Sequence, residues 1–437
     1  MTRGGALHAR AQRLIPGGGH TYSKGDDQFP SNAPRLIERG DGCYCFDPDG
    51  GRWLDYGMGL RSVLLGHGFA PIVEAAAAEL ARGSNFTRPA PLEGEVAELL
   101  TEIVPCAEMV KFAKNGSDTT SAAVRLARAY TGRDLVAACR TNPFYSFDDW
   151  WIGTTACDAG IPQAVKDQTL TFVYDDLESL RALFAAHPGA IACVILEPVA
   201  LDPPSPGFLQ AVVELAHAEG AVVVFDEMIS GFRYHLRGAQ GLYGAVPDLA
   251  TYGKAIANGF SVAALCGRRE IMALGGLEHD RPRVFLMSAT HGAETHALAA
   301  AAASLRFLQS HDVSGHVAAL GRALRDGLAA AAADAGIGDA VTVLGYDQSP
   351  VIVCRDAAGR VSLPLRTLFL QEMCARGILI PYVAISWAHT RAEIDATVAA
   401  AREAFDVYAR ALEDGVERHL RGPVVKPVFR RWNHRDA

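Results

Sequence analysis

An acid and a lysine, two residue types that often carry chemistry, each follow an apolar segment in the middle of the chain. The run Val222–Phe225 is continuously apolar, as in a strand buried on both faces of a parallel sheet, and it ends on Asp226 and Glu227. Lys254 follows the next short apolar segment, directly after Gly253. Ligands of open α/β sheets bind at the carboxyl ends of the strands, so we expect both side chains at a ligand site. A carboxylate for a charged ring nitrogen and a lysine for a Schiff base fit pyridoxal phosphate.

A third segment offers a place for a phosphate group. Asn115, Gly116 and Ser117 lead from a short apolar stretch into a segment whose apolar residues, from Ala122 to Tyr130, have helical spacing. The first N–H groups of a helix have no partner inside it and lie at the positive end of its dipole, so they bind anions. The same turn would also serve as an ordinary helix cap. Only its combination with the acid and the lysine favours a cofactor phosphate.

Composition narrows the remaining classes of function. The chain has 437 residues, 49% hydrophobic and 21% charged, which is typical of a globular protein with two domains. Its formal net charge of −8 gives no reason to expect nucleic acid or an anionic membrane as a partner. No apolar run approaches the roughly 20 residues of a membrane span, and the N-terminus lacks the apolar core of a signal peptide. Nine scattered cysteines without metal-ligand spacing predict reduced thiols, no metal site and a cytoplasmic location.

The middle of the chain alternates between strand and helix patterns. Ile191–Leu196 has the pattern of a buried strand, Phe208–His217 has helical spacing, and a second strand ends at Asp226. Such βαβ units predict an α/β fold with a mostly parallel sheet covered by helices on both faces. We expect this large, cofactor-binding domain to span residues 50–305.

The two ends of the chain predict a second, smaller α/β domain. An early hairpin is expected over residues 44–56, and Ala-rich helices follow from about residue 310. Short strands are expected at 341–353 and 378–381, and the last helix near Arg391. We therefore expect residues 306–437 to form the small domain, with the segment 1–49 packed against it and the basic tail 421–435 docked on the surface.

Short motifs are spread over nearly the whole chain: Pro16-Gly-Gly, Leu65-Gly-His67, Asn115-Gly-Ser-Asp118, Arg125-Leu-Ala-Arg-Ala-Tyr-Thr-Gly-Arg133, Glu197-Pro198, Asp226-Glu227 and Lys254. In this order and spacing they resemble the class III aminotransferases, which use pyridoxal phosphate, and among them the glutamate-1-semialdehyde aminomutase subgroup. The resemblance implies the type I fold of pyridoxal-phosphate aminotransferases, with a large, mostly parallel-sheet domain and a smaller α/β domain.

The resemblance also implies roles for four residues of the motifs. Lys254 would form the Schiff base with the cofactor and then move the substrate proton as general base and acid. Asp226 would pair with the protonated pyridine nitrogen. Gly116 and Ser117 would hold the phosphate through backbone groups. Taken singly, each has a plainer interpretation, such as a cap, a turn or a surface lysine, so the roles depend on their occurring together.

Three further positions complete the cofactor site that the resemblance implies. Met228 occupies the position, usually valine, that packs on one face of the ring, and Phe144 occupies that of the stacking aromatic. Thr290 matches the threonine that reaches the phosphate of the neighbouring subunit. The resemblance thus implies a homodimer with shared active sites.

Departures from the family pattern concern the substrate. Tyr145 stands where the family commonly has histidine. Lys24 lies in the stretch where the aminomutase has an arginine that holds the substrate carboxylate. Lysine lacks the planar bidentate grip of arginine on a carboxylate. Arg61 is the candidate holder for the carboxylate of the amino donor, and Glu197 either faces the substrate or caps the turn that follows it. Small-molecule donor and acceptor are the partners we expect.

The acceptor is therefore open among several compounds. The acidic residues near positions 26–27 and 148–149 suit hydroxyls and amines, as on an oxidised sugar or an aminoglycoside intermediate, although acidic side chains are usually only solvated. We expect an aminotransferase that moves an amino group onto such a carbonyl compound. The alternatives are an aminomutase of the glutamate-1-semialdehyde type, an elimination that uses the same cofactor, and a degenerate binding protein, which the presence of Lys254 disfavours.

Overall fold

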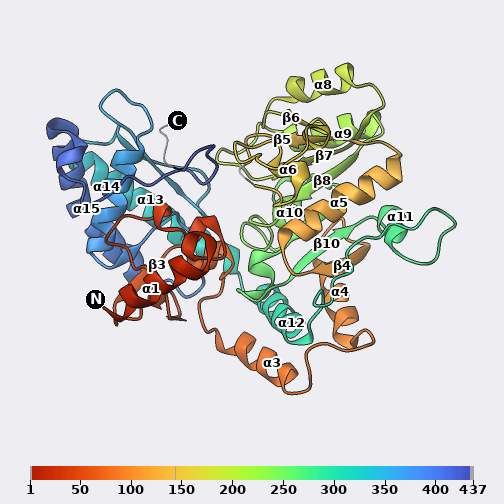
Figure 1. Cartoon of the computed structure of the whole chain (residues 1–437), viewed down its shortest axis with the longest axis horizontal. Helices are drawn as coiled ribbons and strands as arrows, with labels where there is room; N and C mark the ends of the chain where they lie inside the picture. Colours follow the sequence, from red (N-terminus) through yellow and green to blue (C-terminus); the bar gives the residue numbers. More distant parts are fainter. Residues whose placement is uncertain (1, 143, 434–437) are drawn as a thin grey trace. The chain divides into compact units, whose positions relative to one another are not determined.

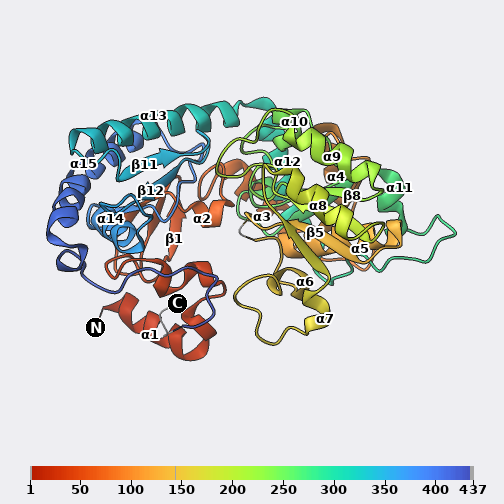
Figure 2. The same ribbon diagram turned by 90° about the horizontal axis from the view of Figure 1, so that it is seen from above.

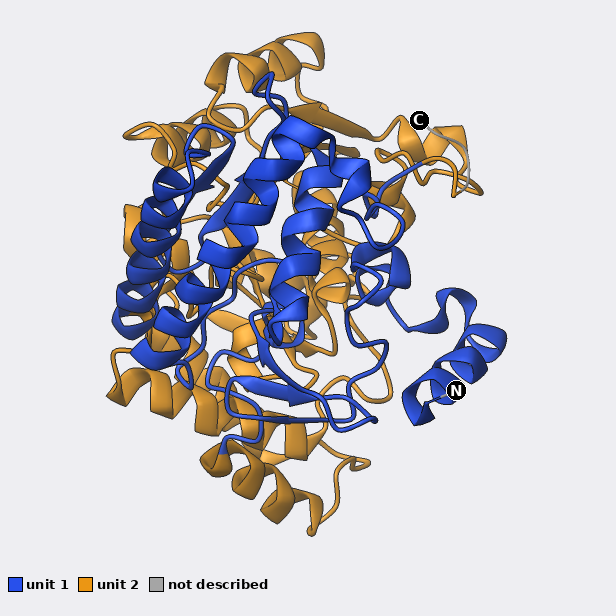
Figure 3. Cartoon of the chain, turned by 90° about the vertical axis from the view of Figure 1, so that its left-hand side faces the viewer, with its two compact units in different colours: residues 1–69, 315–430 blue, residues 70–314, 431–437 orange. Residues whose placement is uncertain are grey.

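The computed structural model describes residues 2–142 and 144–433, and it divides the chain into two compact units. Unit 1 comprises residues 1–69 and 315–430, and unit 2 comprises residues 70–314 and 431–437 (Figure 3). These boundaries differ from 49/50 and 305/306, which the sequence predicts. The first lies later because the predicted hairpin pairs inside unit 1, and the second because the helix Thr295–Ser310 packs on Ala70–Leu80 and Pro91–Ile103 of unit 2.

Unit 2 is built on a seven-stranded sheet of order β4-β10-β9-β8-β7-β5-β6 (Figure 1). Its pairs from β9 to β6 are parallel, and β10 is antiparallel to both β9 and β4, so the predicted mostly parallel sheet is confirmed. The strands are β4 (Met109–Ala113), β5 (Leu135–Cys139), β6 (Thr169–Phe172), β7 (Ile191–Leu196), β8 (Val222–Asp226), β9 (Leu249–Tyr252) and β10 (Ala263–Gly267).

Helices cover this sheet and bury its central strands. All residues of β7 and β8 are buried, which explains their continuous apolar runs. Helix α5 packs on β7, β9 and β10, and α9 packs on β8. The helices of unit 2 are α3 (Ala70–Leu80), α4 (Pro91–Ile103), α5 (Gly116–Thr131), α6 (Asp149–Ile152), α7 (Gln163–Lys166), α8 (Leu177–Ala186), α9 (Phe208–Ala218), α10 (Gly238–Tyr243), α11 (Arg269–Met272) and α12 (Thr295–Ser310).

Unit 1 holds a four-stranded sheet of order β1-β2-β3-β13, whose last pair is parallel, and the hairpin β11–β12. Unit 1 has two long helices, α13 and α15 (Figure 2). An ion pair between Arg402 and Asp334 joins them. Its strands are β1 (Arg39–Asp41), β2 (Tyr44–Phe46), β3 (Arg52–Asp55), β11 (Val341–Leu344), β12 (Val351–Cys354) and β13 (Ile378–Leu379). Its helices are α1 (Arg3–Leu14), α2 (Met58–Arg61), α13 (Val313–Asp334), α14 (Leu363–Ala375) and α15 (Arg391–Asp414).

The basic tail docks within unit 1 on the segment that precedes β1. The N–H of Lys426 donates to the carbonyl oxygen of Asp27 at 2.8 Å, and the guanidinium of Arg430 pairs with the Asp27 carboxylate. The amide of Gln28 donates to the carbonyl oxygen of Lys426 at 3.0 Å. Among the described helices, none is long and apolar enough to cross a membrane.

Candidate active site

Asp226 lies at the carboxyl end of β8 and is 3% exposed. Its Oδ1 accepts hydrogen bonds from the N–H of Met228 at 2.9 Å and from the hydroxyl of Thr251, on the neighbouring strand β9, at 3.2 Å. No described residue donates a hydrogen bond to its Oδ2. Burial raises the pKa of Asp226, and the positive charge of Lys254 opposes that shift. The arrangement is a buried carboxylate with one oxygen left for a cationic partner.

Lys254 follows β9, the strand beside Asp226, and begins the short helical turn Lys254–Ala257. Its backbone has a φ of 40°, in the left-handed region that non-glycine residues adopt at a cost of roughly 1–3 kcal/mol. Residues held in such conformations cluster at functional sites. Because the charge of Lys254 lowers the pKa of Asp226, the two side chains act on each other electrostatically. The acid and the lysine predicted from the sequence are thus brought together.

The N-terminus of α5 presents the predicted phosphate cradle. Asn115 and Asp118 form a capping box in which each side chain accepts from the other's backbone N–H, at 3.1 and 3.3 Å. The reciprocal bonds engage two of the N–H groups that a helix start leaves without partners. Those of Gly116 and Ser117 lie between them at the positive end of a 16-residue helix, where they can donate to an anion.

Met228 connects the cradle with the lysine turn. A Cβ atom added to Gly116 would lie 2.7 Å from the Met228 sulfur, and one added to Gly253 would lie 2.6 Å from it. Both distances are shorter than any ordinary contact, so a Cβ at either position would displace the thioether from the place it occupies. Met228 is 8% exposed and packs with Ala113 and Ala263. It therefore has the surroundings of a wall that could support one face of an aromatic ring.

The two aromatic residues after β5 have different environments. Phe144 is 43% exposed, as a stacking ring must be before a cofactor covers it. Tyr145 is 2% exposed, belongs to the core of unit 2 and contacts Trp151 edge-to-face at 4.7 Å between ring centroids. Its hydroxyl donates to Oδ1 of Asn142 at 2.5 Å. This position favours support of the site wall over direct contact with a substrate.

Glu197 follows β7 and lies next to Asn142, a residue to which no pattern in the sequence points. Glu197 is 9% exposed, and its N–H donates to Oδ1 of Asn142 at 3.1 Å. Asn142 itself is 3% exposed and follows the end of β5. In the sequence, Asn142 is only a polar residue just after an apolar strand. Such residues are common in loops, so the pattern does not distinguish Asn142 from them.

Glu227, beside Asp226, is a buried carboxylate of a different kind. It is 0% exposed and accepts from the hydroxyl of Ser230 and from the N–H groups of Ala239, at 2.9 Å, and Gln240, at 3.3 Å. Burial raises the pKa of Glu227 to about 7 against these hydrogen bonds. It fixes the loop before α10 and has its partners within the fold.

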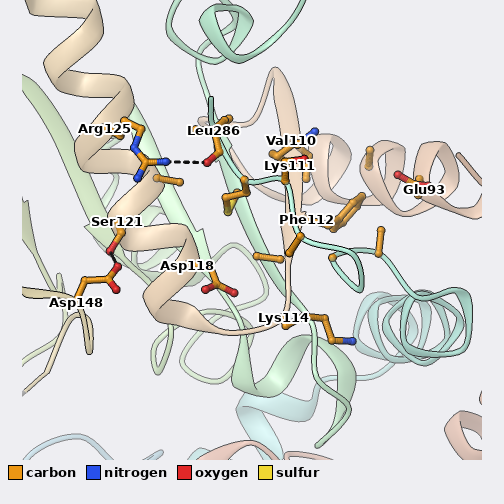
Figure 4. Close-up of a pocket in the computed structure, with 18 of the residues that line it drawn as sticks. Glu93, Val110, Lys111, Phe112, Lys114, Asp118, Ser121, Arg125, Asp148 and Leu286 are labelled. Atoms are coloured by element: carbon orange, nitrogen blue, oxygen red, sulfur yellow. Dashed lines mark hydrogen bonds between the residues drawn. The ribbon is translucent and has the colours of Figure 1, made fainter. Parts of the chain in front are cut away.

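Thr290 is exposed on the loop before α12, and its carbonyl oxygen accepts from the amide of Asn85 at 3.0 Å. The same loop closes one side of a cavity of about 640 Å³ (Figure 4). Arg125, on α5, donates to the carbonyl oxygen of Leu286 there at 3.1 Å. Asp118, of the capping box, lines the cavity, whereas Asp226 and Lys254 do not.

The two predicted substrate cations belong to unit 1. Lys24 is exposed on the helical turn Tyr22–Lys24. Arg61 ends a left-handed turn in which Met58, Leu60 and Arg61 have φ angles of 39°, 59° and 67°, and its guanidinium lies 4.1 Å from the ring centroid of Tyr382. Left-handed backbone costs roughly 1–2 kcal/mol for each non-glycine residue, so this turn is strained.

Comparison with known proteins assigns the family. The model of class-III aminotransferases matches residues 27–346. The chain is 34% identical to a glutamate-1-semialdehyde 2,1-aminomutase of Roseiflexus castenholzii, over 94% of this chain and 99% of that protein.

Two solved structures share the fold at similar identity. One is the FumI protein of Sphingopyxis sp. MTA144 in its pyridoxal-phosphate internal aldimine form, with a TM-score of 0.86, 28% identity and coverage of 94% of this chain and 97% of that one. The other is an omega-transaminase of Sphaerobacter thermophilus, with a TM-score of 0.84, 29% identity and coverage of 94% and 98%. The resemblance noted in the sequence is confirmed: the chain belongs to the class-III aminotransferases and is a transaminase that uses pyridoxal phosphate.

Proposed function

We propose that the chain transfers an amino group from an amino-acid donor to a separate carbonyl acceptor, using the site formed by Asp226, Lys254 and the N-terminus of α5. The observation that carries this proposal is the open Oδ2 of a buried Asp226 beside the charge of Lys254 at a neighbouring strand end. The donor set fits the cofactor: a carboxylate for its ring nitrogen, N–H groups for its phosphate and an amine for its aldehyde.

Bound pyridoxal phosphate supplies an electron sink that makes the C–H bond beside the amino group acidic. Asp226 holds the proton on the ring nitrogen, and Nζ of Lys254 takes the proton from the substrate carbon and returns it to the cofactor carbon. Gly116 and Ser117 fix the phosphate through their N–H groups, while Met228 bounds one face of the ring. We assign the opposite face to Phe144.

Arg61 is our proposal for holding the carboxylate of the amino donor. Its guanidinium is held over Tyr382, and it ends a turn of strained left-handed backbone. Asp55 stabilises the start of the turn by accepting from the N–H groups of Gly57 at 2.7 Å and Met58 at 3.1 Å. A planar guanidinium fixed in this way suits bidentate pairing with a carboxylate.

For the acceptor we propose an uncharged, hydroxylated carbonyl compound, such as an oxidised sugar or an aminoglycoside intermediate. The support is Lys24, which replaces the arginine expected for a second carboxylate. Two of the acidic residues that also suggested a sugar have partners within the fold. Asp26 pairs with His8 and Arg35, and Asp27 pairs with Arg430. We therefore leave these two acidic residues out of the acceptor site, and we assign Tyr145 to its supporting wall and Glu197 to its rim.

The main competing function is intramolecular amino transfer, as in the glutamate-1-semialdehyde aminomutase that is 34% identical. The two proposals differ in what the aminated cofactor form will accept. We would load the enzyme with an amino donor, remove the donor, and mix it separately with keto sugars, aldehydes and glutamate 1-semialdehyde. Recovery of the yellow form with a sugar carbonyl supports our proposal. Recovery only with the semialdehyde would replace it with the aminomutase, and release of a β substituent would indicate elimination.

We further propose a cytoplasmic homodimer in which Thr290 of each chain serves the other chain's phosphate. The support for the location is that all nine cysteines are free and eight are buried. The support for sharing is that Thr290 is exposed on a loop that Asn85 holds in place.

Mixing Thr290→Ala chains with Lys254→Ala chains tests the sharing. In the hybrid dimer only the Thr290→Ala chain keeps a working lysine. Under our proposal its site borrows the intact Thr290 of the other chain and binds the cofactor as tightly as wild type does. A hybrid whose working site is as weak as in the Thr290→Ala homodimer would refute the sharing.

A further inference from the structure

Asn142 has an unusual combination of burial and hydrogen bonding. Its side chain is 3% exposed, and its Oδ1 accepts from the hydroxyl of Tyr145 at 2.5 Å and from the N–H of Glu197 at 3.1 Å. No described residue accepts a hydrogen bond from its amide NH2 group. An amide that is fixed through its oxygen and has no acceptor for its NH2 group among the described residues can donate to a bound ligand.

The orientation of the amide follows from its partners. A backbone N–H can only donate, so the atom of Asn142 that faces Glu197 must be the oxygen. The hydroxyl of Tyr145 approaches the same oxygen and also lies 3.4 Å from the carbonyl oxygens of Cys139 and Ile195, in β5 and β7. The oxygen of the amide is thus directed to the strand ends, and its NH2 group is directed away from them.

Asn142 lies at the same edge of the sheet as the candidate cofactor site. Asn142 follows β5, Glu197 follows β7 and Asp226 ends β8, and these three strands are neighbours in the sheet. The lysine and the phosphate cradle lie on the other side of Asp226, because Lys254 follows β9 and the cradle follows β4, which lies beyond β9 in the strand order. In the pyridoxal ring, the phosphate arm and the phenolic oxygen lie on opposite sides of the line from the ring nitrogen to the aldehyde carbon. The phenolic oxygen would then lie toward β7 and β5.

We propose that Asn142 is a further cofactor-binding residue, whose amide NH2 donates to the phenolic oxygen of pyridoxal phosphate. Tyr145 and Glu197 fix the amide so that the donor is already oriented before the cofactor binds. This assignment rests on the proposed cofactor site. It also gives Tyr145 a positioning role, since its hydroxyl holds the amide oxygen.

A binding cycle with a cofactor analogue tests the contact. The two probes are pyridoxal phosphate and its 3-deoxy analogue, which lacks the phenolic oxygen, and binding to the cofactor-free protein is measured by fluorescence quenching. The variants are Asn142→Asp, which keeps the acceptor oxygen and loses the NH2 group, and Asn142→Ala, which adds no charge. Asn32→Asp is the control, because that amide donates to the carbonyl oxygen of Gln371 in unit 1, at 2.9 Å.

We expect the preference for pyridoxal phosphate over the analogue to fall about tenfold in both Asn142 variants, as for the loss of one hydrogen bond to a charged oxygen. It should stay at the wild-type value in the control. A purely structural role of Asn142 would lower both affinities together and leave the preference unchanged, which would overturn the proposal. A drop in Asn142→Asp alone would be an effect of added charge and would also overturn it.

Two further outcomes separate this proposal from the function on which it rests. An unchanged cofactor preference with a raised KM for the acceptor would assign the NH2 group to a substrate oxygen and overturn the cofactor contact. If the wild-type protein bound neither probe, the cofactor site itself would be wrong. If Asn142→Ala does not fold, Asn142→Asp alone is compared with wild type, by the acceptor KM and by the preference for pyridoxal phosphate over the analogue. An unchanged preference still refutes the contact.

Discussion

Replacing Asp226 by asparagine isolates the charge that we assign to the ring nitrogen. Asparagine keeps an oxygen for the hydrogen bonds from Met228 and Thr251, so the contacts of the strand end remain. The change falls on Oδ2, the oxygen that no described residue engages. A neutral amide in its place cannot stabilise a protonated ring nitrogen as the carboxylate does.

The size of the effect follows from the burial of the site. Asp226 is 3% exposed, and two opposite unit charges 4 Å apart interact by about 4 kcal/mol at an effective dielectric constant of 20. If that interaction is lost from the transition state, the half-reaction should slow by about a thousandfold. Stopped-flow measurement of the loss of yellow colour, on mixing the loaded enzyme with an amino donor, gives this rate directly.

Glu227→Gln, assayed well above pH 7, is the matched control, since at that pH it removes a buried carboxylate charge from the adjacent residue. Glu227 is engaged by Ser230, Ala239 and Gln240, so its loss should change the half-reaction by less than about tenfold, or roughly 1.4 kcal/mol. An equally small effect in Asp226→Asn would refute the proposed ion pair with the ring.

Three other outcomes follow from single contacts. The pKa of Glu227 is raised to about 7 in the folded protein, so its contribution to the free energy of unfolding, about 3 kcal/mol, is present below pH 4.5 and lost as the pH rises through 7. Urea unfolding of the cofactor-free protein should show this pH dependence, and Glu227→Gln should remove it. Gly116→Ala places a Cβ 2.7 Å from the Met228 sulfur and should weaken cofactor affinity by about 1–3 kcal/mol, with recovery in the double variant that adds Met228→Val, by equilibrium dialysis. Arg61→Ala should raise KM for amino-acid donors at least tenfold, for a lost charged hydrogen bond, and leave KM for amines without a carboxylate unchanged.

The strands and helices that position the site were predictable because their burial is uniform. Val222–Phe225 and Ile191–Leu196 are continuous apolar runs, and the structure makes them β8 and β7 with every residue buried. The turn formed by Asn115, Gly116 and Ser117 likewise indicated the start of α5. In each case the pattern and its physical cause lie within a few neighbouring residues, so the sequence alone was sufficient to predict the element.

The parts that sequence did not predict depend on contacts distant in the chain. The unit boundary lies near residue 70 because β13 pairs with β3 across more than 300 residues, and no composition change marks it. The side chain of Asn142 joins Tyr145 to Glu197, which lies 55 residues away from Asn142. The pairing of Asp27 with Arg430 spans 403 residues, so its acidic segment had the pattern of an open binding surface.

The identity of the lysine that binds the cofactor tests the central claim most directly. The protein loaded with pyridoxal phosphate would be reduced with borohydride, digested and mapped by mass spectrometry. We expect a single pyridoxyl label on Lys254 and, in Lys254→Ala, a folded protein that still binds the cofactor but carries no label and does not turn over. A label on another lysine, such as Lys111 or Lys114, or turnover by Lys254→Ala, would contradict it.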